Sequence, residues 1–220
     1  EATRRKMSPK MLCAFKDGTK TMVEMTAMSN YTGLIPDVIG GHGPKTAPGT
    51  EGIKELNEIF KLKEDGGILN KHGVVEYVNG IAPGVFVEIA YQLGYHSMGP
   101  GPLWTLYRPY HLCNLETPLS VARAVIEGDA TCVAKDGLVS ECITRAKIDL
   151  KAGQTIDGIG GYTTHGSIAT AEESNAKGYV PFGLVTKNAV MKQDVKKGTL
   201  ITYDMIDLDK TTLIYKLRKE

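Results

Sequence analysis

This sequence has almost no excess of charge of either sign, and it has no long hydrophobic run. Its 26 basic and 25 acidic residues give a formal net charge of +1. Proteins whose main role is to bind a polyanion usually carry a basic excess or stripe, so we expect no nucleic-acid partner. No stretch approaches the length of about 18 apolar residues that a membrane-spanning helix needs, so we also expect no membrane partner.

Cysteine is scarce, and its spacing excludes the common cysteine motifs. The four cysteines lie far apart, no C-x-x-C pair occurs, and none stands at zinc-finger distance from a histidine. We therefore predict small core thiols in a reducing compartment, the cytoplasm, and no structural metal site. A bridge between Cys132 and Cys142 is the alternative that the spacing leaves open.

The sequence also lacks a nucleotide-binding fingerprint. Residues 158–161 (Gly-Ile-Gly-Gly) lack the later glycine of the dinucleotide motif and have no clear helix after them. Residues 40–43 (Gly-Gly-His-Gly) precede Pro44 and fit no phosphate loop. Because the chain opens at Glu1 in charged, helix-like sequence, we interpret it as a piece of a longer polypeptide; removal of disordered or tag residues is the alternative.

Glycine and proline divide what is present into short helices and strands, which predicts an α+β fold. We expect a buried strand over residues 11–15, a helix from Asp17 to Gly33 that is apolar on most sides, a loop over 36–50 and an amphipathic helix over 53–60.

Further along, three strands and a helix are expected. The strands are predicted over residues 74–78, 85–90 and 103–107. The helix is predicted over residues 118–126, with Pro118 at its first position and Thr117 as its cap.

From about residue 138 the chain changes to short β segments that alternate with turns. One helix is expected there, over residues 171–177, because residues 170–173 (Thr-Ala-Glu-Glu) form a capping box and Gly178 is a suitable stop. We therefore predict two domains, residues 1–137 and residues 138–220.

The second half contains one internal repeat. Residues 146–156 and 191–201 each run from a strand through Asp-apolar-Lys-x-Gly into a second strand. We call these two turns the elbows, and we expect each aspartate to bind its own turn and each glycine to supply a positive φ.

The sharpest candidate site surrounds Lys20. Asp17 is placed to cap the helix, Lys20 falls in its first turn, and Glu24 follows one turn later. A lysine at a helix N-terminus opposes the macrodipole, which favours its neutral form and suits acid–base catalysis. We expect Glu24 to be partly buried and to orient the amine. A surface ladder of Asp17, Lys20 and Glu24 is the alternative.

A second candidate site contains groups that can hold an oxygenated substrate. Arg108 can bind a carboxylate or phosphate through its planar fork, while Tyr110 and His111 can hydrogen-bond to oxygens. His42, in a long glycine-rich loop, is a further candidate. The alternative for the Arg108 stretch is a structural one, an aromatic-rich strand end with an arginine at the surface. We expect His72, His96 and His165 to be ordinary surface or turn residues.

Six stretches together resemble the homoserine-dehydrogenase-like oxidoreductases that end in an SAF domain. They are FKDGTKTMVEMTAMSN, GLIPDVIGGHGP, DGGIL, NGIAPGVFV, LYRPYHLCNLETPLSVA and DLKAGQTIDGIGGYTTHG, and they occur in the family's order over nearly all 220 residues. The nearest characterised group is the reductoisomerase-like enzymes that form 2-C-methyl-D-erythritol 4-phosphate.

The resemblance implies a domain plan and a cofactor. In that family a Rossmann domain binds NAD(P), a middle α+β domain holds the substrate and forms a dimer, and the SAF domain follows. Residues 1–137 are similar to the middle domain and residues 138–220 to the β-clip SAF domain, so NAD(P) would be held mostly by a domain outside this chain. A homodimer is implied and, for a reductoisomerase, a divalent metal ion at the substrate oxygens.

The resemblance also matches Lys20 to the catalytic lysine of homoserine dehydrogenases and Asp17 to its acidic neighbour, although their spacing is one position shorter here. We therefore predict an NAD(P)-dependent oxidoreductase that acts on a small polar carbonyl or alcohol, phosphorylated or not, and is inactive without its nucleotide-binding domain. The alternative is a non-catalytic SAF-type module that binds a carbohydrate-like ligand or a partner protein.

Overall fold

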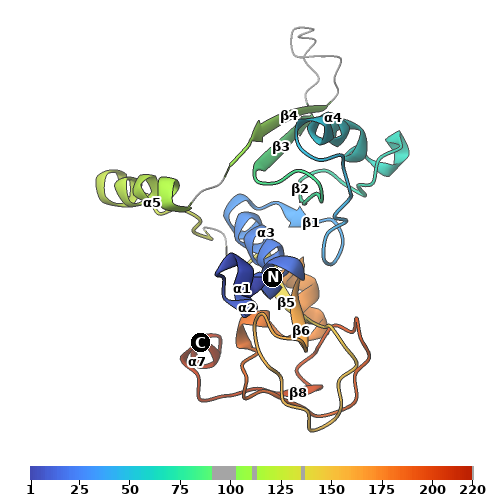
Figure 1. Ribbon diagram of the computed structural model, residues 1–220, viewed down its shortest axis with the longest axis vertical. Helices are drawn as coiled ribbons and strands as arrows, with labels where there is room; N and C mark the ends of the chain where they lie inside the picture. The colour runs from blue at the N-terminus through green and yellow to red at the C-terminus, as the bar shows by residue number, and fades with distance from the viewer. Residues whose placement is uncertain (91–102, 111–112, 135–136, 220) are drawn as a thin grey trace. The chain divides into compact units, whose positions relative to one another are not determined.

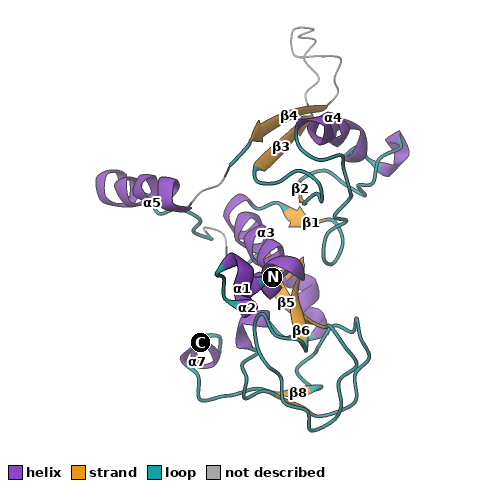
Figure 2. Cartoon of the chain, viewed as in Figure 1, coloured by secondary structure: helices purple, strands orange, loops and turns teal. Residues whose placement is uncertain are grey.

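The computed structural model describes residues 1–90, 103–110, 113–134 and 137–219 (Figure 1). It contains two compact units, which are described separately: the first unit comprises residues 1–40 and 134–220, and the second unit comprises residues 41–133. Both combine helices with short strands, which confirms the predicted α+β fold (Figure 2).

The first unit joins the N-terminal helices to the strands β5 to β8 of the C-terminal segment. Its elements are α1 (Ala2–Arg5), α2 (Pro9–Lys16), α3 (Thr19–Thr32), β1 (Ile35–Pro36), β5 (Ser140–Ala146), β6 (Thr164–Thr170), α6 (Ala171–Lys177), η4 (Phe182–Leu184), β7 (Val190–Met191), β8 (Ile206–Asp207) and α7 (Leu213–Leu217). The helix predicted over residues 171–177 is confirmed, and Thr170 caps it by accepting a hydrogen bond from the amide of Glu173.

The strand predicted over residues 11–15 is wrong, because these residues lie in helix α2. Pro9 occupies a first-turn position after Ser8, where its fixed φ favours a helix and its missing N–H costs nothing. Met11 and Phe15 stand four positions apart and are both exposed, so the apolar run covers one helical face instead of entering a sheet.

The helix predicted to end at Gly33 is confirmed as α3, with Gly33 at φ +79° beyond its last turn. It buries one face, formed by Thr19, Met22, Met25 and Ser29. The expectation that it is apolar on most sides and therefore buried is only partly correct, because Val23 and Met28 are exposed.

Helix α3 packs on the antiparallel hairpin of β5 and β6, as Figure 1 shows. Asn30 anchors one end: its side-chain oxygen accepts from the amides of Val139 and Ser140 at 2.7 and 2.9 Å, and its Nδ2 donates to the Ser140 carbonyl at 3.1 Å. At the other end, the amide of Gly166 on β6 donates to Thr19 Oγ1 in the first turn of α3 at 3.1 Å.

The two elbows bind each other through their backbones and through their aspartates. Leu150 and Val195 exchange two backbone hydrogen bonds, at 2.8 and 2.9 Å. Asp149 accepts from the amide of Lys197 at 2.8 Å, and Asp194 accepts from the amide of Ala152 at 3.0 Å. The aspartates therefore cap the partner elbow, which corrects the expectation that each binds its own turn; the two elbow glycines do have positive φ, as predicted.

The elbows enclose the main core of the first unit. Its buried residues come from both repeats, from the segment between them and from β8: Ala146, Leu150, Ile156, Val180, Leu184, Val185, Ala189, Met191, Val195, Ile201 and Ile206. Reciprocal capping keeps both turns closed over this apolar cluster.

The second unit is built on a β-hairpin and one amphipathic helix. Its elements are α4 (Thr50–Ile59), η1 (Lys63–Asp65), β2 (Val74–Val75), β3 (Val85–Ala90), β4 (Leu103–Arg108), α5 (Cys113–Ala122) and the π-helical turn η3 (Arg123–Glu127). Strands β3 and β4 pair antiparallel, and the Phe60 and Phe86 rings stack with centroids 5.5 Å apart.

Several predicted bounds in this unit are confirmed and others are wrong. The strands over 85–90 and 103–107 and the helix near 53–60 are present. The strand expected over 74–78 contains only two residues, and the helix expected to begin at Pro118 is already formed at Cys113. Thr117 therefore lies inside α5 and does not cap it, since Pro118 falls in the second turn instead of the first.

The cysteines behave only partly as predicted. Cys132 and Cys142 are both free thiols, so the alternative of a bridge between them is wrong. Cys142 is buried, and burial raises the pKa of its thiol to about 12, whereas Cys132 is exposed.

No helix in the described part of the chain is long and apolar enough to cross a membrane. The division into two domains, residues 1–137 and 138–220, stays a prediction.

Replacing Asn30 with alanine should destabilise the first unit. The change removes three hydrogen bonds to backbone groups beside the β5 edge, and we expect a loss of about 2–3 kcal/mol in the free energy of unfolding. Denaturant titration measures it. Asn188→Ala is the control, because Asn188 makes an exposed hydrogen bond to Asp209; equal losses for both variants would contradict this role of Asn30.

Candidate functional site

Lys20 and Glu24 form an exposed ion pair on α3. Lys20 Nζ lies 3.6 Å from Glu24 Oε1, and the two side chains are 40% and 44% exposed. The same ammonium stands 4.2 Å from the centroid of the Phe15 ring. Glu24 is therefore placed to orient the amine, and it is partly buried, as predicted.

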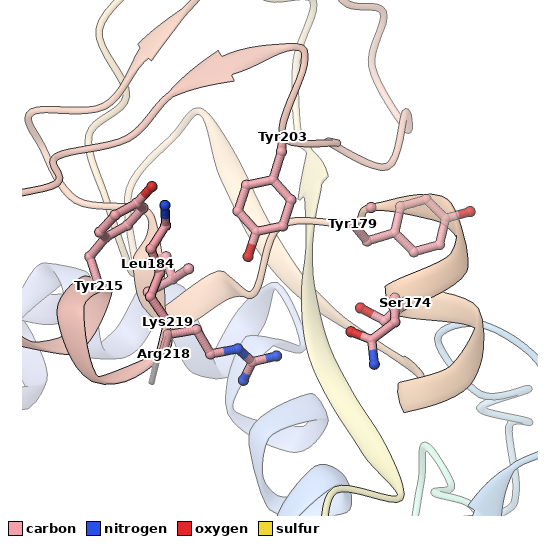
Figure 3. Close-up of a pocket in the computed structure, with 9 residues that line it drawn as sticks. Ser174, Tyr179, Leu184, Tyr203, Tyr215, Arg218 and Lys219 are labelled. Atoms are coloured by element: carbon pink, nitrogen blue, oxygen red, sulfur yellow. The ribbon is translucent and has the colours of Figure 1, made fainter.

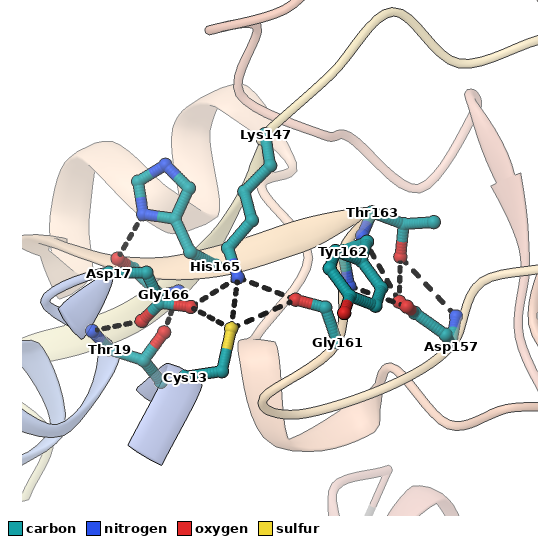
Figure 4. Close-up of polar contacts among 10 residues, drawn as sticks. All are labelled: Cys13, Asp17, Thr19, Lys147, Asp157, Gly161, Tyr162, Thr163, His165 and Gly166. Carbon is teal, nitrogen blue, oxygen red and sulfur yellow. Dashed lines mark hydrogen bonds and ion pairs between the residues drawn. The ribbon is translucent and has the colours of Figure 1, made fainter. Parts of the chain in front are cut away.

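Asp17 makes its ion pair with Lys147 and not with Lys20 (Figure 4). Both side chains are largely buried, with exposed fractions of 12% for Asp17 and 15% for Lys147. Asp17 Oδ1 also accepts from the amide of Thr19, the first residue of α3, at 2.9 Å, although Gly18 and not Asp17 occupies the N-cap position. The predicted ladder of three side chains therefore contains only Lys20 and Glu24.

Lys147 is the centre of a polar cluster that Figure 4 shows in full. Besides the bond to Asp17, its ammonium donates to the Gly161 carbonyl at 2.6 Å and lies 3.4 Å from Cys13 Sγ. The Cys13 thiol in turn lies 3.6 Å from the Gly161 carbonyl. Three donors of one ammonium thus reach α2, the α2–α3 turn and the glycine turn before β6.

The electrostatics of this pair favour the charged forms of both partners. Burial alone would raise the pKa of Asp17, but hydrogen bonds from Lys147 and Thr19 outweigh it and the pKa is lowered. Burial alone would lower the pKa of Lys147, but the contact with Asp17 reverses this and the pKa is raised.

The neighbouring turn and strand supply two further titratable groups. Burial opposes ionisation of Asp157, but hydrogen bonds from Thr163 and the amide of Tyr162 lower its pKa, so a carboxylate closes the glycine turn. His165 lies on β6 with Nδ1 3.1 Å from the Gly166 carbonyl. Burial lowers the pKa of His165, which favours the neutral ring. The expectation of an ordinary surface or turn histidine is wrong, because the ring is half-buried on a strand.

Sequence reasoning missed Lys147 and Cys13 as members of this cluster. Lys147 and Asp17 are 130 positions apart, and no local pattern relates them. A helical assignment for residues 11–15 would have placed Cys13 one turn before Asp17, which was the one available signal.

The predicted substrate residues in the second unit form two separate groups. The His42 loop is fixed by Glu76, which accepts from the amides of His42 and Gly43 at 2.7 and 3.4 Å. Arg108 pairs with Glu116, and its guanidinium carbon lies 5.0 Å from the centroid of the Tyr110 ring. Arg108 and Tyr110 line one hollow of about 500 Å³ beside β3 and β4. His111 lies outside the described residues.

The two glycine-rich segments do not fit a dinucleotide. A Cβ on Gly160 would lie 2.3 Å from the Lys10 carbonyl oxygen, so the chain itself fills the space that a pyrophosphate would need. The amides of His42 and Gly43 already bind Glu76. Within the described ranges, no group of three or more His, Cys, Asp or Glu side chains is arranged to hold a metal ion.

Comparison with known protein families gives one match. Residues 1–117 match the family described as oxidoreductase DRL, catalytic domain, which is more than half of the 220 residues. This range includes α2, α3 and the β3–β4 hairpin, and therefore Lys20 and Arg108. A comparison with curated proteins finds no match.

The pair of Asp17 and Lys147 predicts a stability window in pH. Because the folded pKa of Asp17 is lowered, its contribution is present above the ordinary value of 3.8 and is lost as the pH falls through the folded pKa. Because the folded pKa of Lys147 is raised, its contribution is present below 10.5 and is lost as the pH rises through the folded pKa.

Lys147→Met should therefore cost about 3 kcal/mol at neutral pH, because it leaves a largely buried carboxylate without its cation. In this variant the free energy of unfolding should also change less with pH, both in the acid range and in the alkaline range. Lys10→Met is the matched control, since Lys10 donates only an exposed hydrogen bond to the Asp157 carbonyl. Unchanged acid and alkaline limbs in Lys147→Met would show that the pair does not stabilise the fold.

Proposed function

This chain belongs to the oxidoreductase DRL family, through the catalytic domain that residues 1–117 match, and we propose that it is the substrate-handling part of an NAD(P)-dependent cytoplasmic enzyme. The proposed substrate is a small polar carbonyl or alcohol, phosphorylated or not. The resemblance to homoserine-dehydrogenase-like and reductoisomerase-like enzymes supports this choice. The misfit of both glycine-rich segments favours NAD(P) binding by other residues.

Lys20 is proposed to carry the proton transfer, and its accessibility is the observation on which this rests. A general acid or base must come within hydrogen-bond reach of the substrate oxygen. The Lys20 side chain is 40% exposed and has one carboxylate partner, Glu24, at 3.6 Å. Lys20 would protonate the oxygen of a carbonyl during reduction or accept the proton of an alcohol during oxidation, with Glu24 holding the amine in place.

Asp17 takes a different role in this proposal from the one its sequence position suggests. Its carboxylate is committed to Lys147 and to the amide of Thr19, so it is not free to exchange a proton with a substrate. We assign Asp17 to positioning: it fixes the first turn of α3, from which Lys20 projects. Lys147 shares this role from the opposite side of the contact.

Arg108 is proposed to hold an anionic group of the substrate. A guanidinium binds carboxylate and phosphate oxygens through two parallel N–H bonds. Arg108 is exposed at a hollow that Tyr110 and Glu116 also line. An incoming anion would replace or share the contact with Glu116, and the Tyr110 hydroxyl could bind a neighbouring oxygen. His42 and His111 stay proposals as further substrate contacts.

Lys20→Met, made in the full-length enzyme, should separate chemistry from binding. It removes the proton donor and keeps the apolar stem, so kcat should fall by about 10²- to 10⁴-fold with little change in KM. Arg108→Lys should mainly raise KM, because it keeps the charge and loses the planar fork. Steady-state kinetics with a screened carbonyl substrate measure both.

The control for Lys20→Met is Lys54→Met. Lys54 is another exposed lysine, and it pairs with Glu51 one turn away on the same helix. Lys54→Met should leave kcat unchanged. If Lys20→Met also keeps kcat within a few-fold of the parent, the catalytic role of Lys20 is wrong and the exposed pair is only a surface contact.

A homodimer is proposed through the outer face of the β3–β4 hairpin. Phe86 faces the core cluster under α4, whereas Val85, Val87, Ile89 and Leu106 are exposed large apolar residues. An identical face on a second copy is self-complementary about a two-fold axis. Arg108 and Glu116 lie at its margin with opposite charges, which suits such a contact, and a second copy would close one side of the hollow at Arg108.

Val87→Asp should convert this dimer to a monomer, because it would bury a charge at the centre of the apolar face. Light scattering at micromolar concentration measures the mass, and circular dichroism checks the fold. Ile148→Asp, at an exposed apolar residue of the first unit, is the control and should leave the mass unchanged. A monomeric parent protein would overturn the proposal.

A further inference from the structure

The first unit contains a cavity that shares no residue with the cluster around Lys147. It has a volume of about 500 Å³ and lies between the end of α6 and helix α7 (Figure 3). This volume suits a small organic ligand, since ligand pockets commonly measure about 300–1,000 Å³. The residues that the argument uses are Ser174, Asn175, Tyr203, Tyr215, Arg218 and Lys219.

The cavity carries a net positive charge at one wall. Arg218 pairs with Glu141, a side chain that is only 13% exposed, so this arginine is held in place and its charge is balanced. Lys219 adds a second cation, whose Nζ lies 5.6 Å from the centroid of the Tyr215 ring. A guanidinium has five N–H donors, and the hydrogen bond that Glu141 accepts from Nη2 uses one of them. The wall therefore suits a ligand with a single negative charge.

The remaining lining supplies hydroxyl and amide groups together with aromatic rings. In Figure 3 the Tyr203 hydroxyl and the Arg218 guanidinium point into the same space, with Ser174 on the opposite side. Burial raises the pKa of Tyr203, so its hydroxyl keeps its proton and can donate. Asn175 offers both a donor and an acceptor. Such a set satisfies several ligand hydroxyls at once, while the tyrosine rings cover apolar C–H surface.

The geometry points to a binding site for a monosaccharide-sized sugar acid, with the carboxylate at Arg218 and Lys219 and the hydroxyls at Tyr203, Ser174 and Asn175. A simple carboxylate would leave the hydroxyl and amide groups without partners. A neutral sugar would bring no negative charge to Lys219. The inference is independent of the proposed oxidoreductase activity, because none of these residues takes part in it.

Calorimetric titration of the full chain with D-glucuronate tests the site, with D-glucose and acetate as the comparison ligands. We expect saturable glucuronate binding with a Kd below about 1 mM and affinities at least about tenfold weaker for glucose and acetate. Equal binding of acetate would show a non-specific anion contact, and equal binding of glucose would show a neutral-sugar site; either result overturns the sugar-acid inference, as does the absence of saturable glucuronate binding.

Two variants locate the site. Tyr203→Phe removes one hydroxyl and should weaken glucuronate binding about 5- to 10-fold, the value of one neutral hydrogen bond. Arg218→Lys keeps the charge and loses the fork, and we expect a loss of about tenfold. Tyr162→Phe is the matched control, because Tyr162 is exposed and does not line the cavity. Unchanged affinity in both cavity variants, with folds intact by circular dichroism, would overturn the placement.

Discussion

The ion pair between Asp17 and Lys147 is the interaction on which the first unit depends. It joins the turn between α2 and α3 to Lys147, the residue directly after strand β5. A largely buried pair of this kind is favourable only when both charges are fully hydrogen-bonded, and here Thr19 and the Gly161 carbonyl complete the set. The hydrogen bond from the Gly166 amide to Thr19 and the three bonds of Asn30 then hold both ends of α3 on the hairpin.

This arrangement separates the two charged groups at the start of α3 into different tasks. Asp17 is covered and paired, so it holds the helix, while Lys20 is accessible and can meet a substrate. The segment that belongs to the oxidoreductase family ends at residue 117, yet its first helices pack on residues 134–220. The catalytic segment and the C-terminal segment therefore stabilise each other, and a change in β5 or β6 is felt at the helix that carries Lys20.

The C-terminal segment has a second property, which comes from its internal repeat. Two elbows that cap each other close a small apolar core without long strands. Because the core is complete at the elbows, helices α6 and α7 can present their polar groups to a cavity instead of filling it.

The sequence by itself determined the features that depend on neighbouring residues. Gly33 ends α3, Thr170 caps α6 and the elbow glycines take positive φ, since capping and turn geometry act over a few positions. The tertiary structure alone decided which distant groups meet. It made the two elbows cap each other and paired Asp17 with Lys147, 130 positions away. Such contacts are selected by burial and charge pairing in the folded chain, which no local pattern encodes.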